Sequence, residues 1–462
     1  MKKVFILLFG FIICSSQSYS QLLSGKEKVF THADTLRGSI GGERAWWNVL
    51  RYDITVKPDY ERQTISGKNI ITYFDNGGKT MQIDLQEPLE IDSVSSDSQK
   101  NSYRREGNAY HIFIRDSAAK YKIKPGVRTI AVYYHGKPGV AKHAPWDGGW
   151  IWTKDSLGRP WMTLACQGLG ASVWYPCKDY QGDEPDSGAS LTTIVADTLV
   201  AVANGHLMAT KRLPNHLMSY TWAVKSPINN YDIVPYIGKY TFFDTTYNGL
   251  KGELPVSLWA LDYDMDKMKA HCEPDVLKML KAFEYWYGAY PFYEDGYKLV
   301  EAPHLGMEHQ SDIAYGNHFL QGYLGRDLSH TDIGLKFDFI IVHESGHEWF
   351  GNSITSKDIA DMWIHESFTN YCEALFTEYY WGKKQAQDYV FGIRQNIEND
   401  KPIIGVYGVN DEGSGDMYYK GANMINNIRN SMDNDSLFRG LLHGLNTAFY
   451  HQTVTSKQIE DY

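Results

Sequence analysis

Two histidines and two glutamates at fixed spacing are the residues of this chain best suited to metal-assisted chemistry. His343 and His347 are four residues apart, so on a helix they share one face and can bind one ion together. Glu344 then falls beside that ion, and Glu366 follows His347 after eighteen residues, enough to end one helix and begin a second. Two imidazoles, a carboxylate ligand, an open coordination position and a free carboxylate are what zinc-assisted hydrolysis requires. The pattern predicts one Zn²⁺ per chain, bound by His343, His347 and Glu366, with Glu344 as general base to water.

The paired histidines need a buried helix to hold them in place. Apolar residues at helical spacing flank them, at Phe337, Ile340, Ile341 and Phe350, and predict that one side of this helix is buried. The alternative is a surface helix with two solvated histidines and ordinary acidic residues. We favour the metal site because the whole pattern at one fixed spacing rarely arises by chance.

Length, composition and charge limit the fold and the partners. A chain of 462 residues is too long for one core, so two or three domains are expected. The apolar fraction of 43% is typical of a globular protein, and 33 tyrosines and 13 tryptophans favour β-structure. A formal net charge of -10 without a cluster of lysines and arginines argues against nucleic acid or an anionic membrane as partner.

Residues 1–20 have the pattern of a signal peptide. Lys2 and Lys3 precede an apolar run that ends at Ile13, and small residues suit cleavage after residue 20. We therefore expect export to the periplasm or the extracellular space. A lipid anchor at Cys14 is the alternative, although Ile13 is bulkier than the residue such a site prefers. No later apolar run reaches eighteen residues, so no membrane span is expected.

Four cysteines follow the predicted signal peptide, at Cys166, Cys177, Cys272 and Cys372. In an oxidising compartment they could pair, and Cys166 and Cys177 bracket one loop, although buried thiols are equally compatible with the sequence. None belongs to a CxxC pair of the zinc-binding type.

Short strand-like segments separated by turn residues fill the chain from about residue 46 to about residue 240. Examples are 52–56, 69–73, 81–85, 111–114 and 129–134. This favours an antiparallel β domain. After a last strand-like run at 256–261, apolar residues recur at helical spacing over 276–287, and the zinc helices follow.

Two further residues have side chains that could act beside a zinc ion. Glu308 follows a strand-like segment and could pair with a cationic group of a substrate, although a lone glutamate is usually solvated. Tyr418 precedes a helical stretch and could donate to the oxyanion that forms when water attacks a carbonyl, although most tyrosines in such a chain serve packing.

Taken together, these segments resemble the zinc aminopeptidase family that includes aminopeptidase N and leukotriene hydrolase, over almost the whole chain after residue 20. His343–His347 with Glu366 is similar to the zinc signature of that family, and Gly306, Met307 and Glu308 are similar to its exopeptidase motif. Residues 418–421 match its Tyr-x-Lys-Gly motif, and 166–168 resemble the β-domain segment that reaches into the site. The resemblance implies that Glu308 and Gln167 bind the α-amine of a peptide, with Gly306 and Met307 beside the substrate, and that Tyr418 stabilises the tetrahedral intermediate.

The resemblance also implies a multidomain α+β fold. An N-terminal antiparallel β-sandwich or saddle domain, residues 21–245, would precede a thermolysin-like α/β catalytic domain, residues 246–462.

The sequence departs from the family pattern at several positions. Gly306 is one place late in the exopeptidase motif and His309 replaces its Asn, while His365 and Ser367 replace the Asn and Gly beside the third ligand. Only 44 residues follow Tyr418, whereas family members usually add a large helical domain, so we expect a truncated chain.

The sequence is best interpreted as a zinc aminopeptidase that acts on peptides with a free N-terminus. A zinc endopeptidase and a small-molecule hydrolase of the same fold are the alternatives among enzymes. A non-catalytic surface module that binds glycans or proteins is the alternative of another class, but it would need neither Glu344 nor Tyr418.

Overall fold

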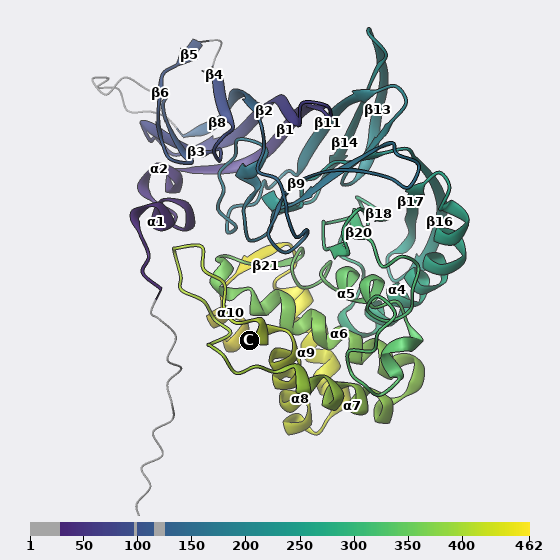
Figure 1. The fold of residues 1–462 in the computed structure, drawn as a ribbon. Coiled ribbons are helices and arrows are strands. Elements are labelled where there is room, and N and C mark those ends of the chain that lie inside the picture. The colour runs from purple at the N-terminus through teal and green to yellow at the C-terminus, as the bar shows by residue number, and fades with distance from the viewer. Residues whose placement is uncertain (1–27, 97–98, 115–124) are drawn as a thin grey trace, which may run out of the picture.

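The computed structural model describes residues 28–96, 99–114 and 125–462. The predicted signal peptide and Cys14 lie outside these residues. The β-rich first half of the chain forms the upper part of the molecule in Figure 1, and the helices of the second half form the lower part.

The described strands of the first half form three sheets. Eight strands are arranged in the order β13-β14-β11-β1-β2-β8-β4-β5, four in the order β12-β15-β10-β9, and three in the order β3-β7-β6. Two short helices, α1 (His32–Gly38) and α2 (Gly42–Ala45), precede the sheets. The strands are β1 (Trp47–Asp59), β2 (Thr64–Asp75), β3 (Thr80–Asp84), β4 (Glu90–Ser96), β5 (Gln99–Asn101), β6 (Tyr103–Glu106), β7 (Ala109–Phe113), β8 (Gly126–Gly136), β9 (Gly149–Lys154), β10 (Pro160–Ala165), β11 (Ala189–Ala196), β12 (Val200–Val202), β13 (His206–Leu213), β14 (Leu217–Val224) and β15 (Tyr236–Gly238).

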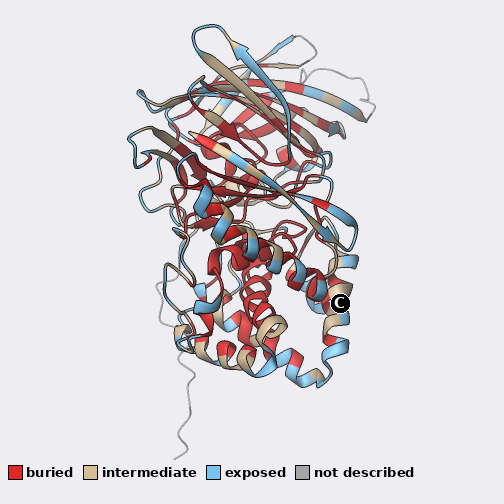
Figure 2. Cartoon of the chain, turned by 90° about the vertical axis from the view of Figure 1, so that its right-hand side faces the viewer, coloured by how far each residue is buried: buried red, intermediate tan, exposed pale blue. Residues whose placement is uncertain are grey.

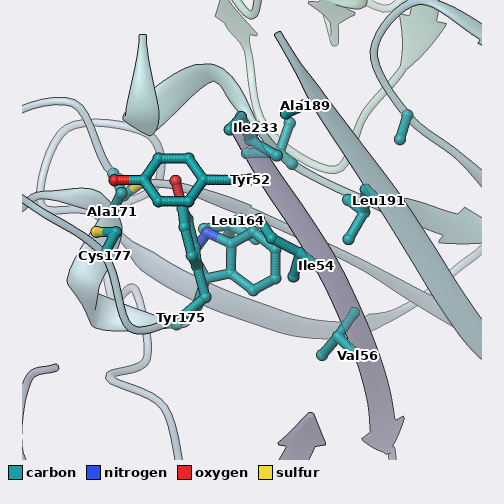
Figure 3. Close-up of a cluster of buried hydrophobic side chains, with 14 of the residues drawn as sticks. Tyr52, Ile54, Val56, Leu164, Ala171, Tyr175, Cys177, Ala189, Leu191 and Ile233 are labelled. Carbon is teal, nitrogen blue, oxygen red and sulfur yellow. The ribbon is translucent and has the colours of Figure 1, made fainter. Parts of the chain in front are cut away.

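The core of the β domain anchors a segment that reaches the site. Because side chains alternate along a strand, Tyr52, Ile54 and Val56 point to the same side of β1, where they belong to one buried cluster with Leu164 and Tyr175 (Figure 3). The rings of Tyr52 and Tyr175 pack edge to face, with centroids 5.8 Å apart. The segment between Leu164 and Tyr175 is therefore held at both ends in the core.

The second half combines a small mixed sheet with a block of helices. The larger of its two described sheets has the order β16-β17-β18-β20-β19, and the smaller pairs β21 with β22. Helix α5 and the first fifteen residues of α6 are buried, and Figure 2 shows red helical segments in this part of the molecule. The elements are β16 (Tyr240–Gly249), β17 (Gly252–Leu261), α3 (Met265–Lys267), α4 (Glu273–Tyr287), β18 (Tyr297–Glu301), β19 (Gly306–Met307), β20 (Ile313–Tyr315), α5 (Phe339–Gly346), β21 (Ile354–Ser356), α6 (Trp363–Trp381), α7 (Lys383–Gly392), α8 (Tyr419–Met432), α9 (Asp435–Ala448), β22 (Gln452–Val454) and α10 (Ser456–Asp461).

The predicted succession of a β domain and a mixed α/β domain is confirmed. The strand-like segments named from the sequence coincide with strands, although 81–85 and 111–114 each extend one residue beyond β3 and β7, and 276–287 lies in α4. Among the described residues, the named strands of the β domain pair in antiparallel fashion except where β1 pairs with β11 in parallel. The preceding strand of this sheet, β8, ends more than fifty residues before β11 begins. A connection of that length, unlike a hairpin, allows the chain to return in the same direction.

The predicted domain boundary at residues 245 and 246 falls inside β16, which pairs along its length with β17. The boundary stays a prediction. All four described cysteines are free, buried thiols, so the buried-thiol alternative describes Cys166 and Cys177. None of the described helices is both long and apolar enough to span a membrane.

Candidate metal centre and active site

The three predicted metal ligands converge from two helices. His343 lies in α5, His347 follows its last residue with helical backbone angles, and Glu366 lies in the first turn of α6. The Nε2 atoms of His343 and His347 lie 3.7 Å and 3.5 Å from Oε2 of Glu366. The apolar residues predicted to bury this helix, Phe337, Ile340, Ile341 and Phe350, are at most 1% exposed.

This arrangement fits a tetrahedral zinc ion. Zinc bonds to histidine and carboxylate of about 2.0–2.1 Å place two ligand atoms about 3.4 Å apart on the edge of a tetrahedron. The two distances to Glu366 are close to that value, and Oε2 of Glu366 is buried without a hydrogen-bond partner among the described residues. A buried carboxylate oxygen that lacks a donor costs free energy unless a cation meets it.

A second layer of residues orients the ligands. Nδ1 of His343 lies 2.8 Å from Oε1 of Glu373, and Nδ1 of His347 lies 3.0 Å from the carbonyl oxygen of Phe350. Both Nε2 atoms are therefore left to face the ion. Burial opposes a charge on His343, but the carboxylates of Glu366 and Glu373 outweigh it and raise the histidine pKa.

The predicted general base, Glu344, packs against Gly306, the first residue of the motif at 306–308. A Cβ atom on Gly306 would lie 2.6 Å from Oε1 of Glu344 and 2.9 Å from Ile340, so only glycine leaves room for the carboxylate there. Burial raises the pKa of Glu344 to about 8. Such a carboxyl group holds a proton more tightly than an exposed one and is suited to accept one from water.

The predicted amine anchor lies beside the metal ligands. Glu308 directly follows β19, the edge strand of its sheet, and is 3% exposed. One carboxylate oxygen of Glu308, one of Glu344 and a ring nitrogen of His347 lie within 4.8 Å of one another. Burial raises the pKa of Glu308, so a cationic partner would stabilise its charged form.

Side chains from the β domain meet this anchor. Nε2 of Gln167 and the hydroxyl of Tyr231 both donate to Oε1 of Glu308, the second over 2.9 Å. Asn352 donates from Nδ2 to the backbone carbonyl of Glu308 over 2.8 Å. The segment that carries Gln167 thus reaches from the β core into the site, as the resemblance implies.

Tyr418 stands at the start of α8 and faces the metal ligands. Its ring stacks on that of His343 with centroids 6.1 Å apart. Burial and the carboxylate of Glu366 raise the pKa of Tyr418 well above its usual value, so the hydroxyl stays protonated and can donate. The next helical turn is close to α6, because a Cβ atom on Gly421 would lie 1.9 Å from Oγ of Ser367.

The predicted residues line one cavity of about 220 Å³. All nine of them contribute to its wall, namely Gln167, Gly306, Met307, Glu308, His343, Glu344, His347, Glu366 and Tyr418. Most of the remaining cavity wall is formed by Pro145, Trp146, Leu169 and Glu412. The structure thus brings every predicted site residue together, while the role of each stays a prediction.

Three residues of the site, Glu373, Tyr231 and Asn352, were not predicted from the sequence. Glu373 could have been found, because it lies seven residues after Glu366 and therefore two turns along the same helix face. Tyr231 and Asn352 gave no such signal, since Tyr231 lies in a single 3-10 turn (Asn230–Asp232) and Asn352 in a turn before β21.

The substituted residues near the third ligand have local roles. Nε2 of His365 accepts a hydrogen bond from the backbone of Ser356, and Oγ of Ser367 donates to the carbonyl of Met417. His309 is buried and hydrogen-bonded to the hydroxyl of Tyr236.

Comparison with known proteins agrees with this geometry. Residues 275–462 match the model of the peptidase family M1 domain. The chain is 24% identical to aminopeptidase N of Lactobacillus helveticus over 84% of its own length and 46% of the relative's, and 29% identical to leucine aminopeptidase 2 of Neurospora crassa over 46% and 29%. It thus spans less than half of the length of these relatives.

Solved structures show the same fold. An M1 zinc metallopeptidase from Deinococcus radiodurans, a mutant bound to a Tyr-Ser-Ala substrate, superposes with a TM-score of 0.74 at 18% identity, over 91% of this chain and 92% of that one. Native yeast LTA4 hydrolase superposes with a TM-score of 0.70 at 16% identity, over 90% and 64%. Residues 275–462 thus match the peptidase family M1 domain in sequence, and the chain shares the fold of these solved structures.

Proposed function

We propose that this protein is a zinc-dependent aminopeptidase that binds one zinc ion per chain and removes residues from the free N-terminus of peptides. One observation carries the proposal. The carboxylate of Glu308 lies within 4.8 Å of both Glu344 and His347. An extended residue spans about 3.3–3.6 Å, so an ammonium held at Glu308 places the first peptide bond at the metal ligands.

The residues of the site divide the reaction among them. A zinc ion held by His343, His347 and Glu366 would supply Lewis acidity and lower the pKa of water. Glu344 would take the proton from the attacking water and pass it to the leaving amine. Tyr418 would donate to the oxygen that gains charge as the carbonyl is attacked.

Recognition of the N-terminus belongs to Glu308 and its β-domain partners. Paired with an ammonium, a buried carboxylate such as that of Glu308 forms a strong charge-assisted hydrogen bond. Gln167 donates to this carboxylate through its amide nitrogen, and its amide oxygen remains as an acceptor for the ammonium. An endopeptidase has no use for a buried anion one residue from the scissile bond.

A pair of peptides tests the proposal. We expect the zinc-loaded protein to release the first residue of a free tripeptide at least about a hundredfold faster than it cleaves the N-acetylated tripeptide, because a charged anchor lost in a buried site costs about 3 kcal/mol or more. A chelator should abolish turnover, and added zinc should restore it. Equal rates on both peptides would favour an endopeptidase, and no turnover with zinc bound would favour a binding module.

We also propose that the protein is exported. The pattern of residues 1–20 supports cleavage by a signal peptidase. Expression of the full chain should yield a protein that begins at Gln21 in the periplasm or medium. A mature N-terminus at a lipid-modified Cys14 would support the anchored alternative instead.

A further inference from the structure

The amino-terminal strap, residues 28–39, lies against loops from both domains that border the active-site cavity. At its start, Nζ of Lys28 is 2.6 Å from Oδ1 of Asp411. At its end, Gly38 touches the same loop of the catalytic domain, because a Cβ atom there would lie 2.3 Å from the backbone nitrogen of Asn410. Glu412, one residue beyond Asp411, lines the cavity itself.

The strap and the catalytic domain both bind one carbonyl oxygen of the β domain. The oxygen of Gly168 accepts one hydrogen bond from Nη2 of Arg37 and one from Nδ2 of Asn410, each 3.1 Å long. Gly168 directly follows Gln167, whose amide donates to Glu308. Two separate parts of the chain therefore bind the carbonyl of the residue next to Gln167, the side chain that supports the amine anchor.

The backbone of Arg37 is held in place by the side chain of Arg44. Arg44 is fully buried and donates from Nη1 to the carbonyl oxygens of Arg37 and Ser39, over 2.6 Å and 2.9 Å. Its Nη2 atom pairs with Asp84 of the β domain. The guanidinium of Arg37 thus approaches Gly168 from a backbone tied to the β core.

We propose that Arg37, together with Asn410, is a positioning residue that sets Gln167 against Glu308 and thereby tunes recognition of the substrate's ammonium group. This inference rests on the proposed aminopeptidase function. Neither side chain needs to touch the substrate. Loss of either bond lets the backbone at Gly168 shift, and the shift weakens the support that Gln167 gives to the anchor.

Paired inhibitors test this role. Phenylalaninamide carries the ammonium group, and 3-phenylpropanamide is the same molecule without it. For Arg37→Ala we expect a five- to tenfold rise in the inhibition constant of phenylalaninamide and in KM for a free peptide. The inhibition constant of 3-phenylpropanamide and kcat should change less than twofold.

Two further variants separate positioning from a general structural effect. In a Gln167→Ala background, Arg37→Ala should add less than a 1.5-fold change, because the residue through which it acts is gone. Arg51→Ala is the matched control, since Arg51 also donates to a loop carbonyl, that of Ser187 over 2.8 Å, away from the cavity. It should leave both inhibition constants unchanged.

The outcomes distinguish the inference from the function on which it rests. A wild-type protein that binds both inhibitors equally would overturn the proposed aminopeptidase function. A wild-type protein that prefers phenylalaninamide, with an Arg37→Ala variant that keeps the full preference, would overturn the inference alone. Equal effects of Arg37→Ala with and without Gln167 would also overturn it.

Discussion

At the scale of single residues, the proposed mechanism assigns metal binding and proton transfer to different side chains. Glu344 lies outside the group of His343, His347 and Glu366 that could hold an ion, and it packs against Gly306 at the cavity wall. We therefore expect Glu344→Gln to retain zinc and lose a factor of about 10²–10⁴ in kcat, because an amide cannot accept the proton. Zinc content by elemental analysis and kcat on one peptide measure the two effects. Wild-type turnover in this variant would refute the mechanism.

Replacement of Glu373, the hydrogen-bond partner of His343, should affect zinc binding rather than turnover. Glu373 fixes the ring of His343 and is itself held by Asn370 and Tyr389, over 2.8 Å and 2.6 Å. Glu373→Gln should weaken zinc binding by about 10–100-fold and leave kcat of the zinc-saturated enzyme within a few fold. Competition with a zinc-sensitive chelator gives the affinity. An unchanged affinity would show that Glu373 does not support the ligand.

The proposed role of Glu308 as the amine anchor predicts a loss of activity that depends on the substrate. Glu308→Ala should weaken cleavage of peptides with a free N-terminus far more than that of N-acetylated peptides, because only the first class presents an ammonium. The ratio of kcat/KM for the two classes measures the effect. Proportionate losses on both would show that Glu308 does not bind the amine.

At the scale of elements, the contact of α6 with α8 places Tyr418 over the ligands. Gly421 lies against Ser367, whereas no atom of the described residues lies within 4 Å of the Cβ position of Gly440 in α9. Gly421→Ala should destabilise the protein by about 1–3 kcal/mol through overpacking and lower kcat by displacing Tyr418. Gly440→Ala, the matched control, should stabilise it by about 0.5–1 kcal/mol. Thermal unfolding and kcat together check both, and a harmless Gly421→Ala would contradict this packing.

Local sequence patterns predicted the elements that carry chemistry better than their surroundings. The histidine pair, Glu366 and the buried stripe follow from helical spacing, so α5 and the start of α6 were predictable. The parallel pairing of β11, the approach of Tyr231 to Glu308, and the contact of Arg37 with Gly168 were not. Each joins residues more than sixty positions apart through tertiary packing, which no local pattern records.

At the scale of the whole molecule, a segment that carries a buried acid joins the two domains. Residues 181–184 of the β half dock on β21, where Nε2 of Gln181 donates to Oγ of Ser356 over 2.6 Å. Glu184 beside it is 7% exposed, and burial raises its pKa to about 8. An acid whose folded pKa exceeds its unfolded value stabilises the fold at low pH and loses this contribution as pH rises towards 8.

Glu184→Gln should therefore unfold like the wild type near pH 5 and be more stable at pH 7, by on the order of 3 kcal/mol. Thermal unfolding of both proteins across pH 5–8 measures the difference. A difference that does not grow with pH would show that Glu184 is ionised in the folded protein at little cost.

The most direct test of the account is the ratio of initial rates on a free tripeptide and on its N-acetylated counterpart, measured on protein with one equivalent of zinc. An anion one residue from the metal ligands predicts a ratio above about one hundred that falls sharply in Glu308→Ala. A ratio near one in the wild-type protein would contradict the claim that this site recognises a peptide by its N-terminus.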